Sequence, residues 1–93
     1  MREKVVEEYL REQVKAHSGK AYKFTSPGNA GVPDRLVLFP GGRAAFVELK
    51  APGKKPTLLQ QAQIKKISSM GFPVFVIDSK PEVDKFINQY AGV

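Results

Sequence analysis

Two carboxylates and a lysine lie on neighbouring segments in the middle of this chain. The stretch FVELK, residues 46–50, places Glu48 and Lys50 two positions apart, and Asp34 follows a proline in the segment before it. Residues i and i+2 of a β-strand point to the same face, so Glu48 and Lys50 would stand side by side. A surface ion pair is the simple interpretation. The alternative interpretation is that the two residues form half of a catalytic site for phosphate chemistry, because carboxylates bind hard divalent cations and a lysine attracts phosphate.

The segments that carry these residues are expected to form a β-hairpin. Alternating apolar residues favour strands at Asp34–Phe39 and Ala44–Lys50, and the Pro40-Gly41-Gly42 sequence between them favours a tight turn. If the turn is centred on its middle glycine, opposed residues have numbers that sum to about 82. Asp34 then lies across from Glu48, within one residue.

Opposed carboxylates repel each other and destabilise a strand pair. A divalent cation between Asp34 and Glu48 would make the same arrangement favourable, and Mg²⁺ or Mn²⁺ with water in its remaining positions suits such oxygen ligands. Lys50, one pleat further on the same face, would hold a phosphate oxygen or help to position and deprotonate an attacking water. These residues therefore predict metal-assisted hydrolysis of a phosphate ester.

The charge pattern favours a polyanionic partner. The net charge is +6, and residues 35–77 contain seven bases but a single acid, Glu48. A charge-balanced surface would not leave that acid and Asp34 alone in a basic field. The candidate phosphate contacts are Lys54, Lys55, Lys65 and Lys66. A solvated basic face is the alternative interpretation for these lysines.

Length and composition place the chain among small globular proteins. Its 93 residues are expected to form one domain, residues 1–93, with a modest core. The chain has no cysteine, which excludes a disulfide framework or a cysteine zinc site. No stretch approaches the roughly 18 apolar residues of a membrane span. We therefore expect a soluble, cytoplasmic protein without a membrane partner.

The other elements predict an α/β fold. A helix at 2–16 presents Val6, Leu10 and Val14 on one face, and a strand is expected at Ala21–Thr25. Thr57-x-x-Gln60 has the form of a capping box that opens a helix to about Met70, with Leu59, Ile64, Ile67 and Met70 as candidate buried positions. A buried strand, PVFVI at 73–77, and a last helix from Pro81 follow. The antiparallel hairpin and a parallel crossover give a mixed sheet flanked by helices.

The stretch GVPDRLVLFPGGRAAFVELKAPGKKPTLLQ resembles the core of the PD-(D/E)XK nuclease superfamily. Within it, the chain is similar to the small stand-alone phage members of the virus-type replication-repair nuclease family, and the similarity covers nearly its whole length. Pro33-Asp34 matches the PD element, and Glu48-Leu49-Lys50 matches the (D/E)XK element. The resemblance implies the superfamily's restriction-endonuclease-like core, in the order αβββαβα.

The resemblance also implies a set of site residues. Asp34, Glu48 and the main-chain carbonyl of Leu49 would hold the metal. The first-helix glutamate that often completes the metal shell is best matched by Glu3, with Glu7 as runner-up, although a glutamate in the first helical turn also meets the helix dipole favourably. Gln60 matches a glutamine that many members place beside the site, and closing the capping box is its alternative role; the two roles are compatible.

The activity that follows is a Mg²⁺- or Mn²⁺-dependent DNA endonuclease. The resemblance implies in-line attack by water on a phosphodiester, which leaves a 5′-phosphate and a 3′-hydroxyl, in a bacterial or phage-infected cell. A homodimer would supply two sites and extend a small core, so Holliday-junction resolution on branched DNA in DNA repair is the expected task. A non-catalytic nucleic-acid-binding module and an RNA-processing nuclease on the same fold are the alternatives.

Overall fold

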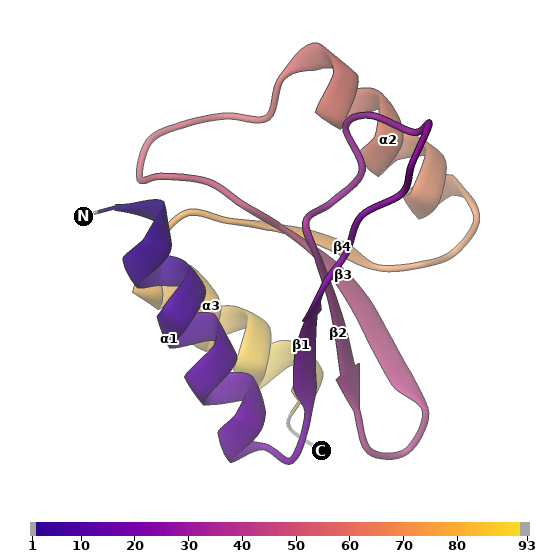
Figure 1. The fold of residues 1–93 in the computed structure, drawn as a ribbon. Helices are drawn as coiled ribbons and strands as arrows, with labels where there is room; N and C mark the ends of the chain where they lie inside the picture. The colour runs from indigo at the N-terminus through magenta and orange to yellow at the C-terminus, as the bar shows by residue number, and fades with distance from the viewer. Residues whose placement is uncertain (1, 92–93) are drawn as a thin grey trace.

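A mixed sheet of four strands, in the order β1-β2-β3-β4, organises residues 2–91, the part of the chain that the computed structural model describes. The elements are α1 (Glu3–Ala16), β1 (Lys20–Lys23), β2 (Arg35–Phe39), β3 (Arg43–Leu49), α2 (Leu58–Ser69), β4 (Val74–Ile77), α3 (Lys80–Phe86) and the π-helical turn η1 (Ile87–Ala91). Helices α1 and α3 cover one face of the sheet, and α2 lies at the other (Figure 1). This arrangement confirms the predicted α/β fold.

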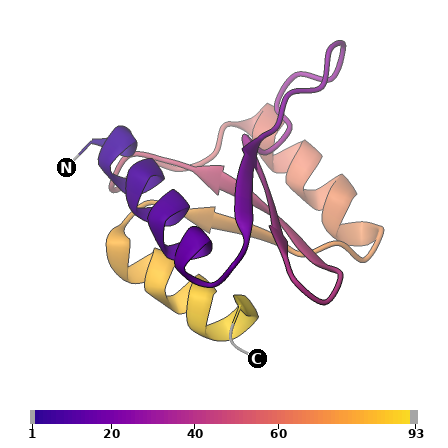
Figure 2. The ribbon, with the colours of Figure 1, turned by 60° about the horizontal axis from the view of Figure 1, so that its bottom comes forward.

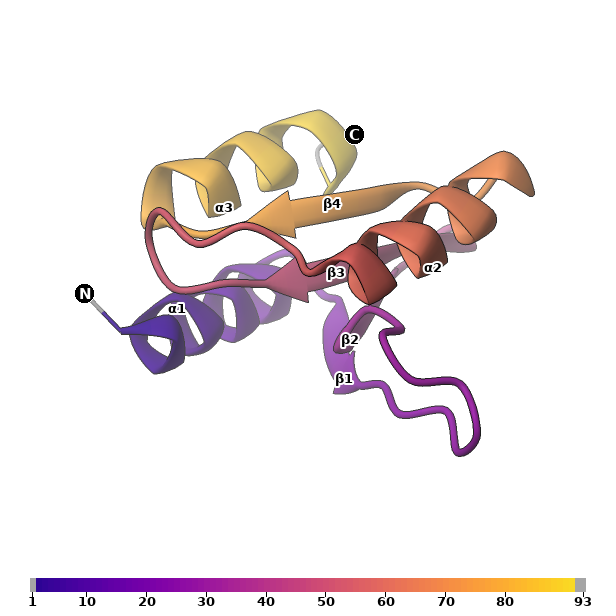
Figure 3. The ribbon, with the colours of Figure 1, turned by 90° about the horizontal axis from the view of Figure 1, so that it is seen from above.

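The strand register agrees with the turn-based prediction. Strands β2 and β3 are antiparallel, with Arg35 opposite Val47 and Phe39 opposite Arg43, so opposed residue numbers sum to 82. Strand β4 is parallel to β3, as predicted for the crossover, and both arrows point the same way in Figure 3. Continuing the β2–β3 register by one residue beyond Arg35 brings Asp34 to the level of Glu48.

The core lies between the sheet and the helix pair α1 and α3, which pack side by side (Figure 2). The predicted apolar face of α1, Val6, Leu10 and Val14, is fully buried. The sheet contributes side chains that alternate along β2 and β3, and α3 with η1 completes the core: Val37, Phe39, Ala45, Val47, Val83, Phe86 and Ile87. The alternation leaves the intervening residues on the α2 side.

Helix α2 is more exposed than predicted, and the expectation of a buried apolar face was wrong. None of its residues is buried, and Leu59 and Met70 are 54% and 61% exposed. Among the strands, α2 packs mainly on the edge strand β4. Strand β4 is also less buried than expected, since Val76 is 40% exposed. A helix over a sheet edge buries less of its surface than one over the centre.

The loop between β1 and β2 holds α2 in place instead. Gly31 has a φ of +89°, and a Cβ at this position would lie 2.9 Å from Leu59 Cγ. Gln63 Nε2 donates a hydrogen bond of 3.3 Å to the carbonyl of Ala30. The segment that leads into Asp34 therefore lies directly against the first half of α2.

Strand β1 begins at Lys20 and ends at Lys23, earlier than the predicted Ala21–Thr25, although the Phe24 N–H still donates to the Asp34 carbonyl at 2.8 Å. The chain then leaves the sheet at the Ser26-Pro27 turn.

Within residues 2–91, no helix combines the length and apolar character that a membrane crossing requires.

Candidate active site

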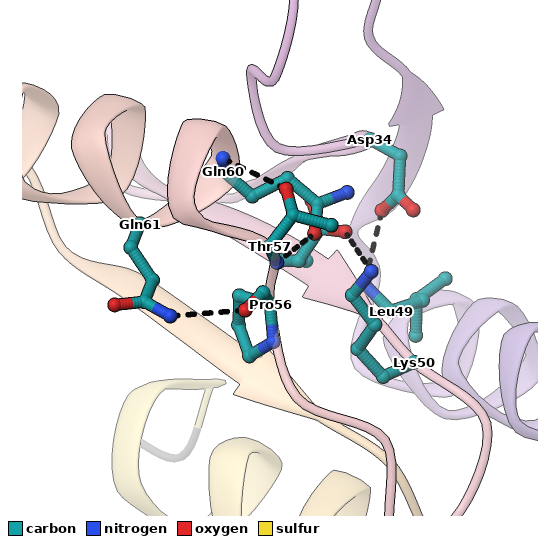
Figure 4. A network of polar contacts seen from close by, with 8 residues as sticks. Asp34, Leu49, Lys50, Pro56, Thr57, Gln60 and Gln61 are labelled. Carbon is teal, nitrogen blue, oxygen red and sulfur yellow. Dashed lines mark hydrogen bonds and ion pairs between the residues drawn. The ribbon is translucent and has the colours of Figure 1, made fainter.

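Asp34 and the end of β3 meet at one edge of the sheet, on the side that α2 partly covers. The hairpin register places Asp34, immediately before β2, beside Glu48 and Leu49, the last two residues of β3. The Leu49 N–H donates a hydrogen bond of 3.1 Å to Asp34 Oδ1 (Figure 4). This bond fixes the Asp34 carboxylate at the end of the neighbouring strand.

Glu48 is a buried carboxylate with an incomplete set of partners. Its side chain is 4% exposed, and Oε2 lies 3.7 Å from the Lys50 ammonium. Its other oxygen, Oε1, is buried and accepts no hydrogen bond from the residues that the structure describes. Burial, and then the negative charge of Asp34, raise the pKa of Glu48 to about 7, while Lys50 acts in the opposite direction. Ionising Glu48 is therefore unfavourable unless further positive charge arrives.

Asp34 shows the same behaviour more weakly. Burial raises the pKa of its carboxyl group, and the hydrogen bond from the Leu49 N–H opposes that effect. The negative charge of Glu3 raises the pKa further. The pKa values of two adjacent carboxyl groups are thus both raised. Placing two such groups together destabilises the protein when no cation is bound, and a cation bound between them would make the arrangement favourable.

These donors fit a divalent cation. Carboxylate oxygens are the ligands that Mg²⁺ prefers, and the unpartnered Glu48 Oε1 is a buried acceptor that a cation would satisfy. The protein supplies few ligands, however. Within residues 2–91, no group of three or more His, Cys, Asp or Glu side chains lies close enough to hold an ion together. A cation at Asp34 and Glu48 would therefore keep part of its water shell, as Mg²⁺ commonly does.

The two first-helix glutamates lie in different surroundings. Glu7 Oε2 lies 2.9 Å from the Arg35 guanidinium, and Arg35 also donates to the Ala21 carbonyl at 3.3 Å. Arg35 follows Asp34 directly and points to the opposite, core-facing side of the sheet. Glu3, by contrast, is the helix residue whose charge raises the pKa of both site carboxyl groups. Glu3 is thus the one directed at the site electrostatically.

Gln60 closes the predicted capping box at the start of α2. The Thr57 hydroxyl accepts from the Gln60 N–H at 3.2 Å, and the Thr57 N–H donates to Gln60 Oε1 at 2.9 Å. In Figure 4, the free end of the Gln60 amide points toward Lys50 and Asp34. The capping role and a place beside the carboxylates are therefore compatible in one side chain.

The four lysines predicted to contact phosphate are all exposed. Lys54 and Lys55 lie in the loop between β3 and α2, and Lys65 and Lys66 lie on α2. Asp78, directly after β4, accepts a hydrogen bond of 3.1 Å from the Gly53 N–H and so anchors the loop that carries the first two. This anchor was not predicted from the sequence. The sequence shows only that Asp78 is an acidic residue at the end of an apolar strand. Its partner, Gly53, lies in a loop that is distant in sequence.

A separate groove of about 760 Å³ lies between α1 and β1, with Arg35 among its lining residues. Neither Asp34 nor Glu48 nor Lys50 lines it. The candidate site lies elsewhere, where the start of β2 meets the end of β3, the two central strands of the sheet.

Comparisons with known proteins agree over most of the chain. No family model matches it. The phage protein "Putative nuclease p44", from Acyrthosiphon pisum secondary endosymbiont phage 1, is 48% identical over 80 residues, which are 86% of each chain. A solved structure described as a VRR_NUC domain is similar with a TM-score of 0.88 and 36% identity, covering 95% of this chain and 96% of that one.

Proposed function

Because this chain belongs to the virus-type replication-repair nuclease (VRR-NUC) family, we propose that it is a metal-dependent endonuclease that hydrolyses phosphodiester bonds in branched DNA. The observation that carries the proposal is the meeting of Asp34 and Glu48 at one sheet edge, with the Lys50 ammonium 3.7 Å from Glu48 Oε2. In a non-catalytic binding module, the buried and unpartnered Glu48 Oε1 would cost stability without a compensating role.

Asp34 and Glu48 would hold the cation through carboxylate oxygens, and Leu49 would contribute its main-chain carbonyl. Glu3 would contribute through water, and Glu7 is the weaker candidate because Arg35 already engages it. When bound, Mg²⁺ or Mn²⁺ supplies Lewis-acid polarisation of the phosphoryl group and lowers the pKa of water.

Lys50 supplies the positive charge that the protein itself brings to the reaction. Its ammonium binds a non-bridging oxygen of the scissile phosphate and orients the attacking water, because it stands beside Glu48 at the edge over which the substrate passes. In-line attack then breaks the bond to the 3′ oxygen and leaves a 5′-phosphate and a 3′-hydroxyl. Gln60 lies alongside as a hydrogen-bond donor.

Binding is proposed to occur through the phosphate backbone. Lys54, Lys55, Lys65 and Lys66 are exposed on the loop and helix that flank the site, and none of them is in an ion pair within residues 2–91. Each phosphate neutralised adds about 0.9 to the slope of log affinity against log salt. Affinity for DNA should therefore fall steeply with salt and vary little with sequence.

The acting form is proposed to be a homodimer that resolves four-way junctions. Helix α2 has no buried residue, and large apolar side chains are exposed on it and just after it: Leu58 is 84%, Met70 61% and Phe72 52% exposed. A second copy on this surface would bury them and bring two sites to one substrate, as paired cuts across a junction require.

The activity is tested with a synthetic four-way junction, a linear duplex and an RNA duplex, each with Mg²⁺ and with a chelator. We expect Mg²⁺-dependent cleavage of the junction in preference to the duplexes, and its loss in Lys50→Ala but not in Lys85→Ala, which changes an exposed lysine of α3. Binding without cleavage under Mg²⁺ and Mn²⁺ would exclude the nuclease, and preferred cleavage of RNA would reassign its substrate.

The oligomeric state is tested by light scattering. We expect a dimer for the wild-type protein and for Ser69→Glu, and a monomer for Met70→Glu, because Met70, unlike its neighbour Ser69, presents an exposed apolar side chain. A wild-type monomer at the concentration of the cleavage assay would exclude the dimer, whatever the activity.

A further inference from the structure

We propose that Thr57 is a positioning residue, whose backbone N–H orients the Gln60 side chain so that its amide nitrogen faces the scissile phosphate at Lys50. The inference rests on the proposed nuclease function. It assigns to the capping box of α2 a role in the reaction in addition to starting the helix.

The chemistry of the capping box fixes which end of the amide is free. A backbone N–H is a donor only, so the Gln60 atom that it contacts at 2.9 Å must be the carbonyl oxygen, Oε1. The amide nitrogen is therefore turned away from Thr57, and it forms no hydrogen bond within residues 2–91. Gln60 thus offers donors alone to whatever lies beyond it, and a phosphate oxygen is an acceptor.

The fold directs that free nitrogen toward the site. The first half of α2 lies against the loop that leads into Asp34, through the contact of Leu59 with Gly31 and the hydrogen bond from Gln63 to Ala30. The short loop before Thr57 begins at Lys50. Helix α2 therefore starts beside Asp34 and Lys50, and in Figure 4 the Gln60 amide nitrogen points toward the side on which Asp34 lies.

A second helix of the same chain shows what capping alone requires. Ser79 caps α3 with its hydroxyl, which accepts from the Glu82 N–H at 3.3 Å, and no reciprocal bond from the residue-82 side chain is present there. Helix α3 covers the opposite face of the sheet, away from the carboxylates (Figure 1). The reciprocal bond occurs in this pair of helices only at the one that borders the site.

The backbone of Thr57 permits a direct test. Its φ of −68° is the value that proline requires, so Thr57→Pro removes the N–H with little change of backbone shape. Thr57→Val removes the hydroxyl and keeps the N–H. Both variants lose the side-chain half of the cap, and only the proline variant loses the bond to Gln60 Oε1. Thr57→Ser keeps both halves and should cleave at the wild-type rate.

We expect kcat for junction cleavage to be about tenfold lower in Thr57→Pro than in Thr57→Val, with KM within about twofold. In a Gln60→Ala background, the proline and valine variants should cleave equally, because Thr57 then has nothing to orient. Ser79→Ala should keep the wild-type rate. Two results would overturn the proposal. One is an equal kcat for Thr57→Pro and Thr57→Val when Gln60 is present. The other is a lower kcat for Thr57→Pro than for Thr57→Val when Gln60 is replaced by alanine.

A readout without turnover separates this inference from the nuclease assignment. With Ca²⁺ in place of Mg²⁺, a short DNA duplex should shift the side-chain amide NMR signals of Gln60 in wild type and Thr57→Val, but not in Thr57→Pro. Unshifted signals in the wild type would overturn the positioning role even if DNA is cut. Shifted signals without cleavage by the wild type would overturn the nuclease and keep the orientation. If Thr57→Pro does not fold, wild-type kcat in Gln60→Ala would overturn the inference alone.

Discussion

Replacing Glu48 with glutamine should stabilise the metal-free protein, and only at a pH where Glu48 would be ionised. The folded-state pKa of about 7 in place of 4.5 corresponds to roughly 3 kcal/mol against the ionised form. Since the folded protein holds the proton more tightly than the unfolded chain does, this stability is fully present below about pH 4.5 and is lost as the pH rises through about 7. Between pH 5 and pH 8, Glu48→Gln should therefore gain on wild type by roughly 2–3 kcal/mol.

Urea unfolding followed by circular dichroism, in the presence of a chelator, measures this difference. The quantity compared is the free energy of unfolding of the variant minus that of wild type, at pH 8 and again at pH 5, so other titrating groups cancel. Glu82→Gln is the matched control, because Glu82 is half exposed and lies 3.9 Å from Lys85; it should change stability by less than about 0.5 kcal/mol. A Glu48→Gln variant that gains nothing at pH 8 would refute the reasoning.

Adding Mg²⁺ should make the wild-type protein more stable than Glu48→Gln. Millimolar Mg²⁺ stabilises wild type by mass action, since only the folded chain brings Asp34 and Glu48 together. Each kcal/mol shifts the midpoint of thermal unfolding by roughly 4–8 °C in a chain of this size. Glu48→Gln has lost a charged ligand, so its melting temperature should respond far less. An equal response in both proteins would place the cation elsewhere.

Three further predictions concern single residues. Lys50→Ala should leave folding and DNA affinity nearly unchanged and lower cleavage at least a hundredfold, as measured by gel assay and fluorescence anisotropy; normal cleavage would contradict the assigned chemistry. Gly31→Ala should lose about 1–3 kcal/mol of unfolding free energy, because the new Cβ meets Leu59 at 2.9 Å, and should lose more than Gly28→Ala, which shares a positive φ but has open space around it; equal losses would mean that backbone strain alone acts. Arg35→Met should lose about 1–3 kcal/mol by urea unfolding, since it leaves Glu7 and the Ala21 carbonyl without their partner; an unchanged midpoint would show that the Arg35–Glu7 pair is replaceable.

The hairpin and its carboxylates were predictable from sequence because local rules determine them. A short turn with two glycines fixes the register, and the two-residue period of a strand then fixes which side chains share a face. Asp34 and Glu48 therefore reach the same edge, and Arg35 reaches the other face, without any knowledge of the rest of the fold. The apolar face of α1 follows from its helical period in the same way.

The surroundings of α2 were not predictable on these grounds. Periodicity indicates that a helix has an apolar side, but Leu59 and Met70 remain exposed because the sheet ends beneath them. The Asp78–Gly53 contact and the Glu7–Arg35 pair join residues far apart in sequence, so they depend on the assembled fold. These long-range contacts anchor the lysine loop and engage Glu7 with Arg35.

Because Asp34 and Arg35 point to opposite faces of the sheet, the orientation of α1 is coupled to the carboxyl groups of Asp34 and Glu48. Arg35 forms an ion pair with Glu7 on the core side of the sheet and so fixes the rotation of α1 about its axis. Its neighbour Asp34 faces the opposite side of the sheet. One helical turn before Glu7, Glu3 is thereby aimed at the carboxylates, whose proton affinities it raises. Replacing Arg35 with an apolar residue is therefore expected to change the electrostatics of the proposed site as well as the packing of α1.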